Sequence, residues 1–298
     1  MSVNETRRAF LHASLGAALS ACAGPRGTVT HAPTEDALRS LRELEAQLGG
    51  RLGLFALDTG NGRQLGHRAD ERFAMCSTFK WLLAASILQQ IDRGALLSTG
   101  RVPYGEADLL EYAPVTRSHV AEGSMTVEAL AEASVTVSDN TAANLLLAHI
   151  GGPSGLTRFA QSLGDSTTRL DRTEPSLNTN DSPEDPRDTT TPRAMVGSMQ
   201  HVLCEGVLSI ESRGLLASWL RASTTGLGRL RAGLPADWIV GDKTGTGEHG
   251  AVNDVAIAWP PGRAPILIAA YLSESSADIA TLNAAHARVG RIVAEALG

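Results

Sequence analysis

The spacing of apolar and polar residues divides the chain into two kinds of segment. From about Phe73 to Leu216, apolar residues recur mostly at intervals of three and four, which is the period of an amphipathic helix. The last third holds apolar, β-branched runs that are separated by Gly and Pro turns, a pattern typical of strands with tight connections. The sequence therefore predicts helices in the middle of the chain and strands near its end.

Strands are predicted near both ends of the chain. Residues 51–71 alternate in hydrophobicity around a Gly-Asn-Gly turn, which favours a β-hairpin. Residues 238–247, 252–261 and 265–274 favour three adjacent antiparallel strands. A helix with Thr34 as its N-cap is expected before the hairpin, and another helix after the last strand. This order indicates an α+β fold, in which one sheet is built from both chain ends and helices are inserted between them.

Two long polar stretches interrupt the helical pattern. One covers residues 101–123. The other, residues 169–192, contains four prolines and is too long to be a simple connection. A loop of this length usually carries function.

The first residues have the layout of an export signal. Arg7 and Arg8 form a twin-arginine pair, and a moderately apolar stretch leads from them to small residues. The sequence "LSAC" resembles a bacterial lipobox, in which Cys22 would become the lipidated first residue of the mature protein. The alternative is an ordinary cleavage site next to Cys22. In both cases residues 1–29 are interpreted as signal and linker, and the mature protein is expected in the periplasm or outside the cell.

Composition excludes several classes of function. The net charge is -6, and no basic run lies outside the extreme N-terminus, so nucleic acid is not expected as a partner. The histidines and the three cysteines show no metal-ligand spacing, so neither a metal nor another cofactor is expected. No transmembrane span is expected in the mature chain. Because no oligomerisation signal is evident, a monomer is expected.

The first sign of chemistry in the sequence is that arginine greatly outnumbers lysine. Of 26 Lys and Arg residues, only Lys80 and Lys243 are lysines. Arginine stays protonated in proteins, whereas a desolvated lysine can lose its proton. Lys80 follows Ser77 by three residues at the start of a predicted helix, so both side chains should lie on one face of its first turn. This spacing would bring a hydroxyl within reach of an amine.

Two other motifs have simple explanations when each is taken alone. The sequence Ser138-Asp139-Asn140 lies between two helical segments and fits a helix N-cap. The sequence "DKTGTG" around Lys243 fits a plain turn. In this order and with these separations, however, SxxK, SDN and KTG resemble the active site of the serine penicillin-recognising enzymes.

A fourth motif narrows the resemblance to the class A β-lactamases. The segment "RTEPSLN", which holds Glu174, resembles the ExxLN motif of the class A loop. The resemblance runs from about Thr34 to the C-terminus. It implies an antiparallel five-stranded sheet that is flanked by helices, with residues 30–72 and 215–298 as an α/β domain. Residues 73–214, including the loop, would form an inserted all-helical domain.

The resemblance also implies the activity and the residues that perform it. The activity is hydrolysis of the β-lactam amide of penicillins and cephalosporins, small-molecule substrates, which confers resistance. The implied catalytic residues are Ser77, Lys80, Ser138, Glu174, Asn178 and Thr246. The implied substrate-binding residues are Asn140, Lys243, Thr244, Gly245, Arg229 and Tyr112.

Within this scheme Ser77 would form the acyl-enzyme, and Glu174 with Asn178 would activate the water that releases it. The base for acylation stays open between Lys80 and Glu174. Two assignments have structural alternatives: Arg229 as a solvated charge at a helix end, and Tyr112 as a buried loop tyrosine.

Three further expectations concern the surroundings of the site. Asp139 is expected to be structural. Arg172 and Asp188 are expected to form a salt bridge that pins the loop around Glu174. Cys76 is expected to be a buried free thiol without a bridge to Cys204, because the position of its partner in some relatives is occupied by glycine, Gly247.

Two alternative functions belong to the same resemblance. One is a penicillin-binding D,D-peptidase, which is acylated but released slowly. The other is a non-hydrolytic β-lactam receptor. Glu174 in its ExxLN setting favours the hydrolase over the peptidase, and a receptor would be expected to carry a membrane helix and a signalling domain, which the sequence does not predict.

Overall fold

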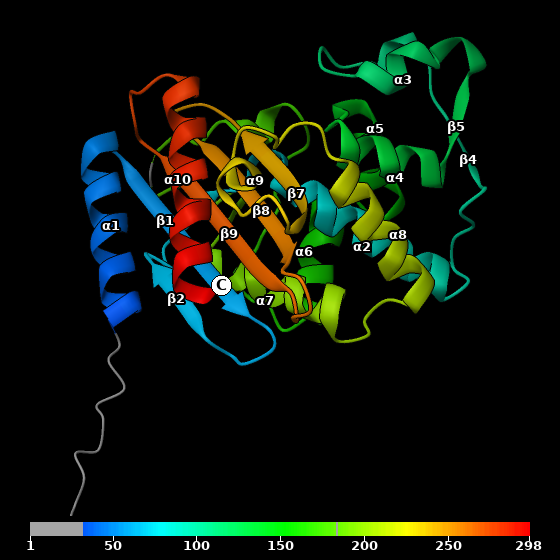
Figure 1. Cartoon of the computed structure of the whole chain (residues 1–298). Helices are drawn as coiled ribbons and strands as arrows, with labels where there is room; N and C mark the ends of the chain where they lie inside the picture. The colour runs from blue at the N-terminus through cyan, green and yellow to red at the C-terminus, as the bar shows by residue number, and fades with distance from the viewer. Residues whose placement is uncertain (1–31, 183) are drawn as a thin grey trace, which may run out of the picture. The chain divides into compact units, whose positions relative to one another are not determined.

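The centre of the molecule is a five-stranded sheet in which every pairing is antiparallel (Figure 1). The strand order is β2-β1-β9-β8-β7. The bounds are β1 (Arg51–Asp58), β2 (Gln64–His67), β7 (Ile239–Thr246), β8 (Val252–Trp259) and β9 (Ile266–Ser273). Since β1 pairs with β9, the sheet is formed from both chain ends, and the predicted α+β class, the hairpin and the three late strands are confirmed.

The computed structural model describes residues 32–182 and 184–298. The predicted export signal and Cys22 therefore lie outside the described residues. The first described helix, α1 (Ala32–Leu48), begins before Thr34, so the prediction of Thr34 as its N-cap is wrong. None of the described helices is long and apolar enough to cross a membrane.

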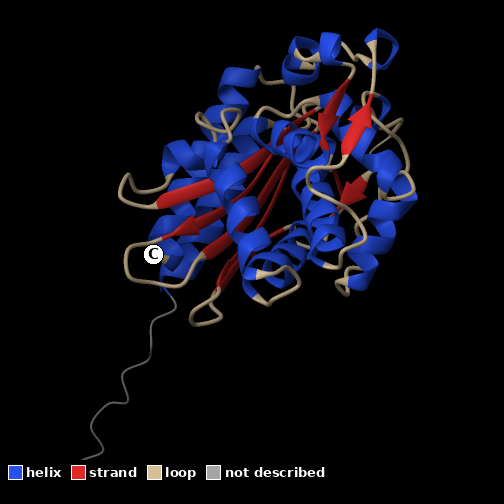
Figure 2. Cartoon of the chain, turned by 90° about the vertical axis from the view of Figure 1, so that its right-hand side faces the viewer, coloured by secondary structure: helices blue, strands red, loops and turns tan. Residues whose placement is uncertain are grey.

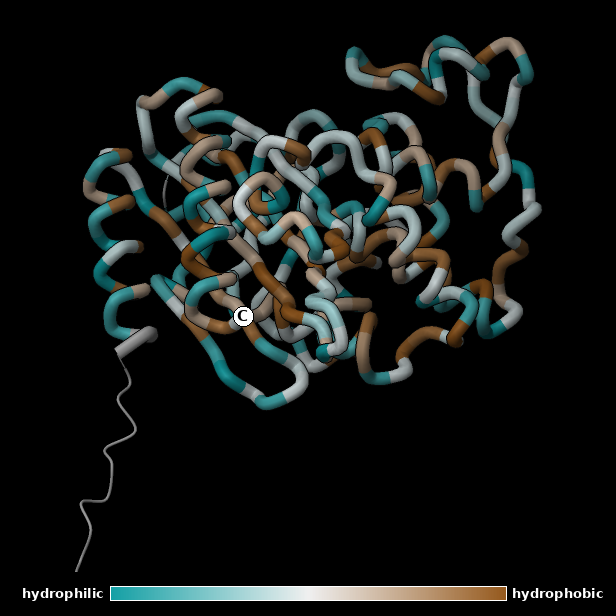
Figure 3. The backbone as a smooth tube through the Cα atoms, in the orientation of Figure 1, coloured by the Kyte–Doolittle hydropathy of each residue, from teal (hydrophilic) through white to brown (hydrophobic). Residues whose placement is uncertain are grey.

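Helices cover both faces of the sheet (Figure 2). α1 and α10 (Ile279–Leu297) pack against one face, where Leu52, Leu54 and Ala56 of β1 enter their hydrophobic cluster. The alternate residues Phe55 and Leu57 point to the opposite face and join the cluster that contains α7 (Pro192–Cys204). Burial on both faces explains why β9 is a nearly continuous apolar run (Figure 3), whereas the inner strand β8 carries the buried polar residues Asn253 and Asp254 near its start.

The middle of the chain is mostly helical, as its period predicts. α2 (Phe79–Asp92) lies at its centre, and every residue from Phe79 to Leu88 is buried. The helices around it are α4 (Val127–Thr136), α5 (Asn140–His149), α6 (Pro153–Ser162) and α8 (Ile210–Ala222).

Short elements connect these layers and were not predicted individually. Two small ladders pair β3 (Phe73–Ala74) with β6 (Thr189–Thr190), and β4 (Arg101–Pro103) with β5 (Ser124–Thr126). The remaining short helices are η1 (Cys76–Thr78), η2 (Glu106–Asp108), α3 (Pro114–Ser118), η3 (Val120–Glu122), η4 (Ser176–Asn178) and α9 (Leu230–Gly233). The β3–β6 ladder anchors the end of residues 169–192, which we call the Glu174 loop. The Arg169 N–H donates to the Thr189 carbonyl oxygen at 3.0 Å and joins the two ends of this loop.

Candidate active site

Ser77 lies in η1, the short helix that leads into α2, and packs close to the edge strand β7. At Gly245 of β7, an added Cβ would lie 2.7 Å from the Met75 carbonyl oxygen and 3.1 Å from the Ser77 nitrogen. Glycine is therefore required for this close approach of β7 to η1. The Ser77 hydroxyl donates a hydrogen bond to Glu174 Oε1 at 3.0 Å.

Lys80 is fully buried one turn after Ser77. Its Nζ lies 2.8 Å from Glu174 Oε1 and donates to the Ser138 carbonyl oxygen at 2.9 Å and to Asn140 Oδ1 at 2.5 Å. Burial lowers the pKa of Lys80, and the charge of Glu174 opposes this shift. Among the described residues, no hydrogen bond joins Lys80 Nζ directly to Ser77 Oγ; Glu174 contacts both groups.

The Ser138 hydroxyl lies between the two lysines of the chain. It accepts from Lys243 Nζ at 3.0 Å and from Lys80 Nζ at 3.3 Å. Lys243 is also fully buried, and burial, followed by the charge on Lys80, holds its pKa well below the ordinary value. Two amines whose proton affinity is reduced therefore converge on one hydroxyl.

Glu174 is buried and held through both its carboxylate and its backbone. Asn178 Nδ2 donates to Glu174 Oε2 at 2.6 Å. The Asn144 side chain accepts from the Glu174 N–H at 3.0 Å and donates to the Glu174 carbonyl oxygen at 2.9 Å. Sequence reasoning missed Asn144. The sequence marks Asn144 only as a polar residue within the otherwise apolar face of the helix "NTAANLLL".

The predicted salt bridge of the Glu174 loop is present. Arg172 Nε lies 2.6 Å from Asp188 Oδ2, and Arg172 Nη2 donates to the Thr179 carbonyl oxygen at 2.7 Å. Asp188 Oδ1 accepts from the backbone N–H groups of Asp171 and Arg172, at 2.7 and 2.9 Å. One buried carboxylate thus joins the start of the loop to its end.

Arg229 is buried behind the edge strand, so its interpretation as a solvated helix-end charge is wrong. Its guanidinium donates to Thr246 Oγ1 at 2.7 Å and to the Gly245 carbonyl oxygen at 2.9 Å. Asn283 of α10 accepts from its Nε at 2.8 Å. Burial lowers the pKa of Arg229. Sequence reasoning missed Asn283 and also Asn253, whose amide donates to the Ala74 carbonyl oxygen at 2.9 Å.

The SDN segment and Tyr112 form the opposite wall of the site. Asp139 caps α5 and accepts from the backbone N–H groups of Val115 and Thr116, at 3.0 and 2.9 Å, which fits the structural role expected for it. The Asn140 N–H donates to the Tyr112 carbonyl oxygen at 3.1 Å. The Tyr112 side chain is 51% exposed, so the alternative of a buried loop tyrosine is wrong.

The thiol next to Ser77 is enclosed. Cys76 and Cys204 are free cysteines, and burial raises the pKa of Cys76 to about 12. A Cβ added at Gly247 would lie 2.6 Å from Cys76 Sγ and 2.6 Å from the Asn178 carbonyl oxygen. Little space therefore remains between β7, Cys76 and the Glu174 loop.

These groups together have the requirements for acyl transfer. A hydroxyl nucleophile contacts a carboxylate that can act as a base, and that carboxylate contacts an amine whose pKa is lowered. Thr244 Oγ1 donates to Thr225 Oγ1 at 2.6 Å beside Lys243, so hydroxyls and an amine line the edge strand where an anionic group would be bound.

A model of the β-lactamase enzyme family matches residues 36–297. The chain belongs to the class A β-lactamase family. This family member is 49% identical over 308 residues to the β-lactamase AST-1 of Nocardia asteroides, with 98% of this chain and 97% of the relative covered. It is 46% identical to the β-lactamase CTX-M-8 of Citrobacter amalonaticus, with 82% and 83% covered.

Solved structures agree with the sequence comparisons. The structure of an ancestral class A β-lactamase is similar to this chain with a TM-score of 0.86 and 55% sequence identity, covering 88% of this chain and 100% of that one. The predicted family, fold and enzyme class are thereby confirmed.

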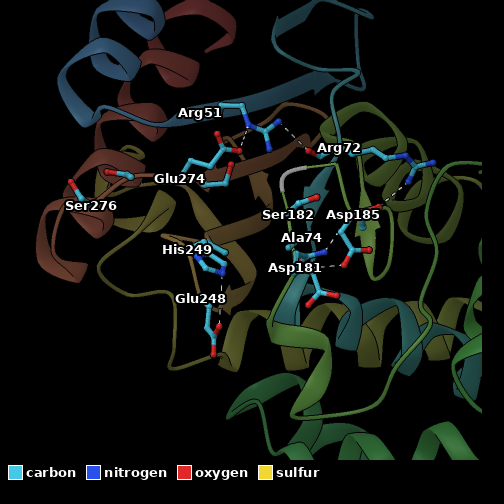
Figure 4. A pocket seen from close by; sticks show the side chains of 15 residues that line it. Arg51, Arg72, Ala74, Asp181, Ser182, Asp185, Glu248, His249, Glu274 and Ser276 are labelled. Carbon is cyan, nitrogen blue, oxygen red and sulfur yellow. Dashed lines mark hydrogen bonds and ion pairs between the residues drawn. The ribbon is translucent and has the colours of Figure 1, made fainter.

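A separate cavity of about 380 Å³ lies behind the Glu174 loop of this β-lactamase (Figure 4). Its wall is formed by Arg51, Arg72, residues of the loop such as Asp181 and Asp185, and Glu248, His249 and Glu274. Within this wall Arg51 Nε donates to Glu274 Oε1 at 2.6 Å. Ala74 lines this cavity and lies three residues before Ser77.

Proposed function

We propose that this protein hydrolyses the β-lactam amide of penicillins and cephalosporins through an acyl-enzyme on Ser77. The observation that carries the proposal is the position of Glu174 Oε1, which is 3.0 Å from Ser77 Oγ and 2.8 Å from Lys80 Nζ. A carboxylate that contacts the nucleophile can take a proton from a water attacking the same carbon. A general base of this kind contributes about a hundredfold to ten-thousandfold to the rate.

In the first step Ser77 Oγ bonds to the lactam carbonyl carbon and loses its proton to Lys80 or Glu174. The backbone N–H groups of Ser77 and Thr246 hold the developing oxyanion, a contribution of about 3 kcal/mol per donor in comparable enzymes. The C–N bond then breaks, and the nitrogen receives a proton through the Ser138 hydroxyl. Contacts of Ser138 with both lysines, at 3.3 and 3.0 Å, support this relay.

In the second step water attacks the acyl carbon, Glu174 takes its proton with Asn178 positioning the water, and Ser77 Oγ regains a proton as the acid leaves. Lys243, Thr244 and Gly245 bind the substrate carboxylate along β7. Arg229 adds positive charge behind Thr246, to which it donates at 2.7 Å. Asn140 and Tyr112 contact the substrate side chain from the opposite wall.

The experiment is turnover of a chromogenic cephalosporin by enzyme at sub-stoichiometric concentration. Many turnovers per enzyme molecule are expected. A burst of one equivalent would reject the proposal and favour a D,D-peptidase or a non-hydrolytic receptor. Glu174→Ala is expected to form an acyl adduct that accumulates and is visible by intact mass, whereas Glu184→Ala, on the same loop and exposed, should turn over normally.

We also propose that the enzyme is exported and acts as a monomer, tethered to a membrane by lipid on Cys22. The twin arginines and the lipobox-like "LSAC" support this. Cys22→Ser should move activity from the membrane fraction to the soluble fraction. Activity that stays soluble in both forms would reject the tether but leave the export proposal standing.

A further inference from the structure

A second cavity, of about 450 Å³, lies between α6 and the start of the Glu174 loop, and the candidate catalytic residues do not line it. Its charged lining is Arg72, Arg158, Arg169 and Asp171. Most of its other lining side chains are hydroxyl-bearing Ser and Thr residues. Three guanidinium groups against one carboxylate make this lining cationic, although the whole chain has a net charge of -6.

The single carboxylate is already occupied. Arg169 Nε donates to both oxygens of Asp171, at 3.2 and 2.9 Å, and lowers the pKa of that carboxyl. In the part of the chain that the structure describes, neither Arg72 nor Arg158 forms a salt bridge. Two like charges that face one cavity repel each other, and a bound anion would relieve that repulsion.

Arg72 is held in place with part of its guanidinium free. Its Nη1 donates to the Thr167 carbonyl oxygen and to Thr189 Oγ1, both at 2.9 Å, while Nε and Nη2 form no hydrogen bond with the described residues. On its other side Arg72 lines the cavity of Figure 4. In that cavity Arg187 Nη2 donates to Asp185 Oδ2 at 2.6 Å. The Asp185 carboxylate is thus paired with Arg187 and not with Arg72.

Arg158 approaches from α6, where it is exposed, and makes one hydrogen bond on its own helix. Its Nη1 donates to Ser154 Oγ at 3.2 Å, one turn earlier on the helix. Arg72, whose Nη1 is already held by two acceptors, loses less entropy when it forms charge-assisted hydrogen bonds to a tetrahedral oxyanion. Hydroxyls of Ser154 and Ser166 in the same lining can add neutral donors.

We propose that this cavity binds a phosphate group, as the free ion or as a phosphate monoester, through Arg72 and Arg158. A volume of about 450 Å³ exceeds what one inorganic phosphate fills, so the body of a small ester also fits.

Phosphate bound in this cavity acts on the two ends of the Glu174 loop. Arg72 contacts Thr167, just before the loop, and Thr189, near its end. The next residue, Phe73, pairs with Thr190 in the β3–β6 ladder. An anion that fixes Arg72 therefore fixes both ends of the segment that carries Glu174. This effect on deacylation rests on the proposed function, whereas the binding itself does not.

The test is titration of the full-length enzyme with inorganic phosphate at constant ionic strength, followed by backbone amide NMR. Saturable shifts are expected at residues 166–169. Because phosphate can also occupy the lysine pocket at β7, shifts at residues 244–246 serve as an internal reference. Arg158→Gln should weaken binding at residues 166–169 about tenfold or more, as expected for loss of a charged hydrogen bond, and leave residues 244–246 unchanged.

Arg93→Gln, which removes an exposed charge elsewhere, is the matched control and should leave both sets of shifts intact. Shifts at residues 166–169 that persist in Arg158→Gln, or that chloride produces equally, indicate an adventitious ion only and overturn the proposal, as does the absence of saturation. The same titration is repeated with glycerol 3-phosphate, a phosphate monoester. Tighter binding than inorganic phosphate assigns the site to a monoester, and equal binding assigns it to the free ion.

The functional consequence is tested separately by single-turnover kinetics. Phosphate should change the deacylation rate of the wild type and of Arg93→Gln, but not that of Arg158→Gln. If the amide shifts are present without any change in deacylation, the site stands and its coupling to the loop is rejected. If the enzyme proves not to hydrolyse β-lactams, the NMR result still decides whether phosphate binds.

Discussion

At Lys80 two effects act on one ammonium group in opposite directions. Burial lowers its pKa, and the charge of Glu174 at 2.8 Å raises it, with the net direction downward. A lysine can respond to this balance by releasing its proton, while an arginine in the same place would remain charged. This difference accounts for the retention of lysine at a position in a chain that otherwise uses arginine for most of its positive charge.

Lys80→Arg is therefore expected to slow acylation about a hundredfold or more, because the positive charge is kept but the proton-accepting amine is lost. Stopped-flow measurement of acyl-enzyme formation checks this. Arg93→Lys, the reverse exchange at an exposed position, should leave the acylation rate unchanged. Near-normal acylation by Lys80→Arg would mean that Lys80 contributes only charge.

Gly247→Ala should slow deacylation and lower the melting temperature. Its Cβ would lie 2.6 Å from the Asn178 carbonyl oxygen, which is backbone, so the Glu174 loop must move and Asn178 with it. Gly214→Ala is the matched control, since nothing lies within 4 Å of its Cβ and alanine favours the helix α8 by about 0.5–1 kcal/mol. Equal melting temperatures for Gly247→Ala and the wild type would show that the Glu174 loop can accommodate a methyl group at position 247.

At the scale of elements, the Glu174 loop has little regular structure and depends on side-chain contacts for its shape. Its hydrogen bonds run to Asn144 of α5, to the β3–β6 ladder and to Asp188 at its own end. The backbone of Glu174 is thus positioned by groups such as Asn144 that take no part in the proposed chemistry.

Arg172→Ala should reduce turnover through deacylation and leave acylation within a few-fold of the wild type. It leaves Asp188, fully buried, without its cation, and losing one partner of a buried pair costs up to about 3–5 kcal/mol. Pre-steady-state kinetics separate the two steps. Arg169→Ala, which breaks the more exposed pair with Asp171, is expected to have a smaller effect. Equal losses in both variants would count against a special role for the Arg172–Asp188 contact.

The same scale separates what the sequence could predict from what it could not. Ser77, Lys80, Ser138, Glu174 and Lys243 stand in motifs, and the structure brings them together. Asn144 and Asn253 could not be found, because their partners are backbone groups of segments distant in the chain. An amide that binds a peptide group leaves no pattern of spacing. The burial of Arg229 was likewise invisible, since it depends on the approach of α10 to β8 and not on neighbouring residues.

For the whole molecule, the sheet with helices on both faces encloses ionisable groups that take no part in the proposed chemistry. His286 of α10 is fully buried, and its Nε2 contacts the Val252 carbonyl oxygen at 2.9 Å. Burial, with the charge on Arg229, lowers the pKa of His286 to about 3. The folded protein therefore holds this imidazole neutral.

Acid should destabilise the protein through His286. In the unfolded chain His286 binds a proton near its ordinary pKa of about 6.5, whereas in the folded chain it does so only near 3. The contribution of the neutral imidazole to the free energy of unfolding is therefore complete above about pH 6.5. It declines as the pH falls toward 3. Urea unfolding at several pH values measures it. His286→Gln, which retains a donor for Val252, should show a shallower loss; identical slopes would refute the assignment.

The place of β9 in the sheet has a consequence for how the enzyme becomes active during synthesis. Residues 266–273 lie between β1 and β8 and pair with both, yet they leave the ribosome after Thr246, the last of the candidate catalytic residues. A nascent or prematurely terminated chain can thus contain every reacting group and still lack the strand that joins its two ends. A stop codon before β9 would remove no catalytic group but would leave the sheet without its central strand. Antibiotic resistance would therefore require that translation is complete.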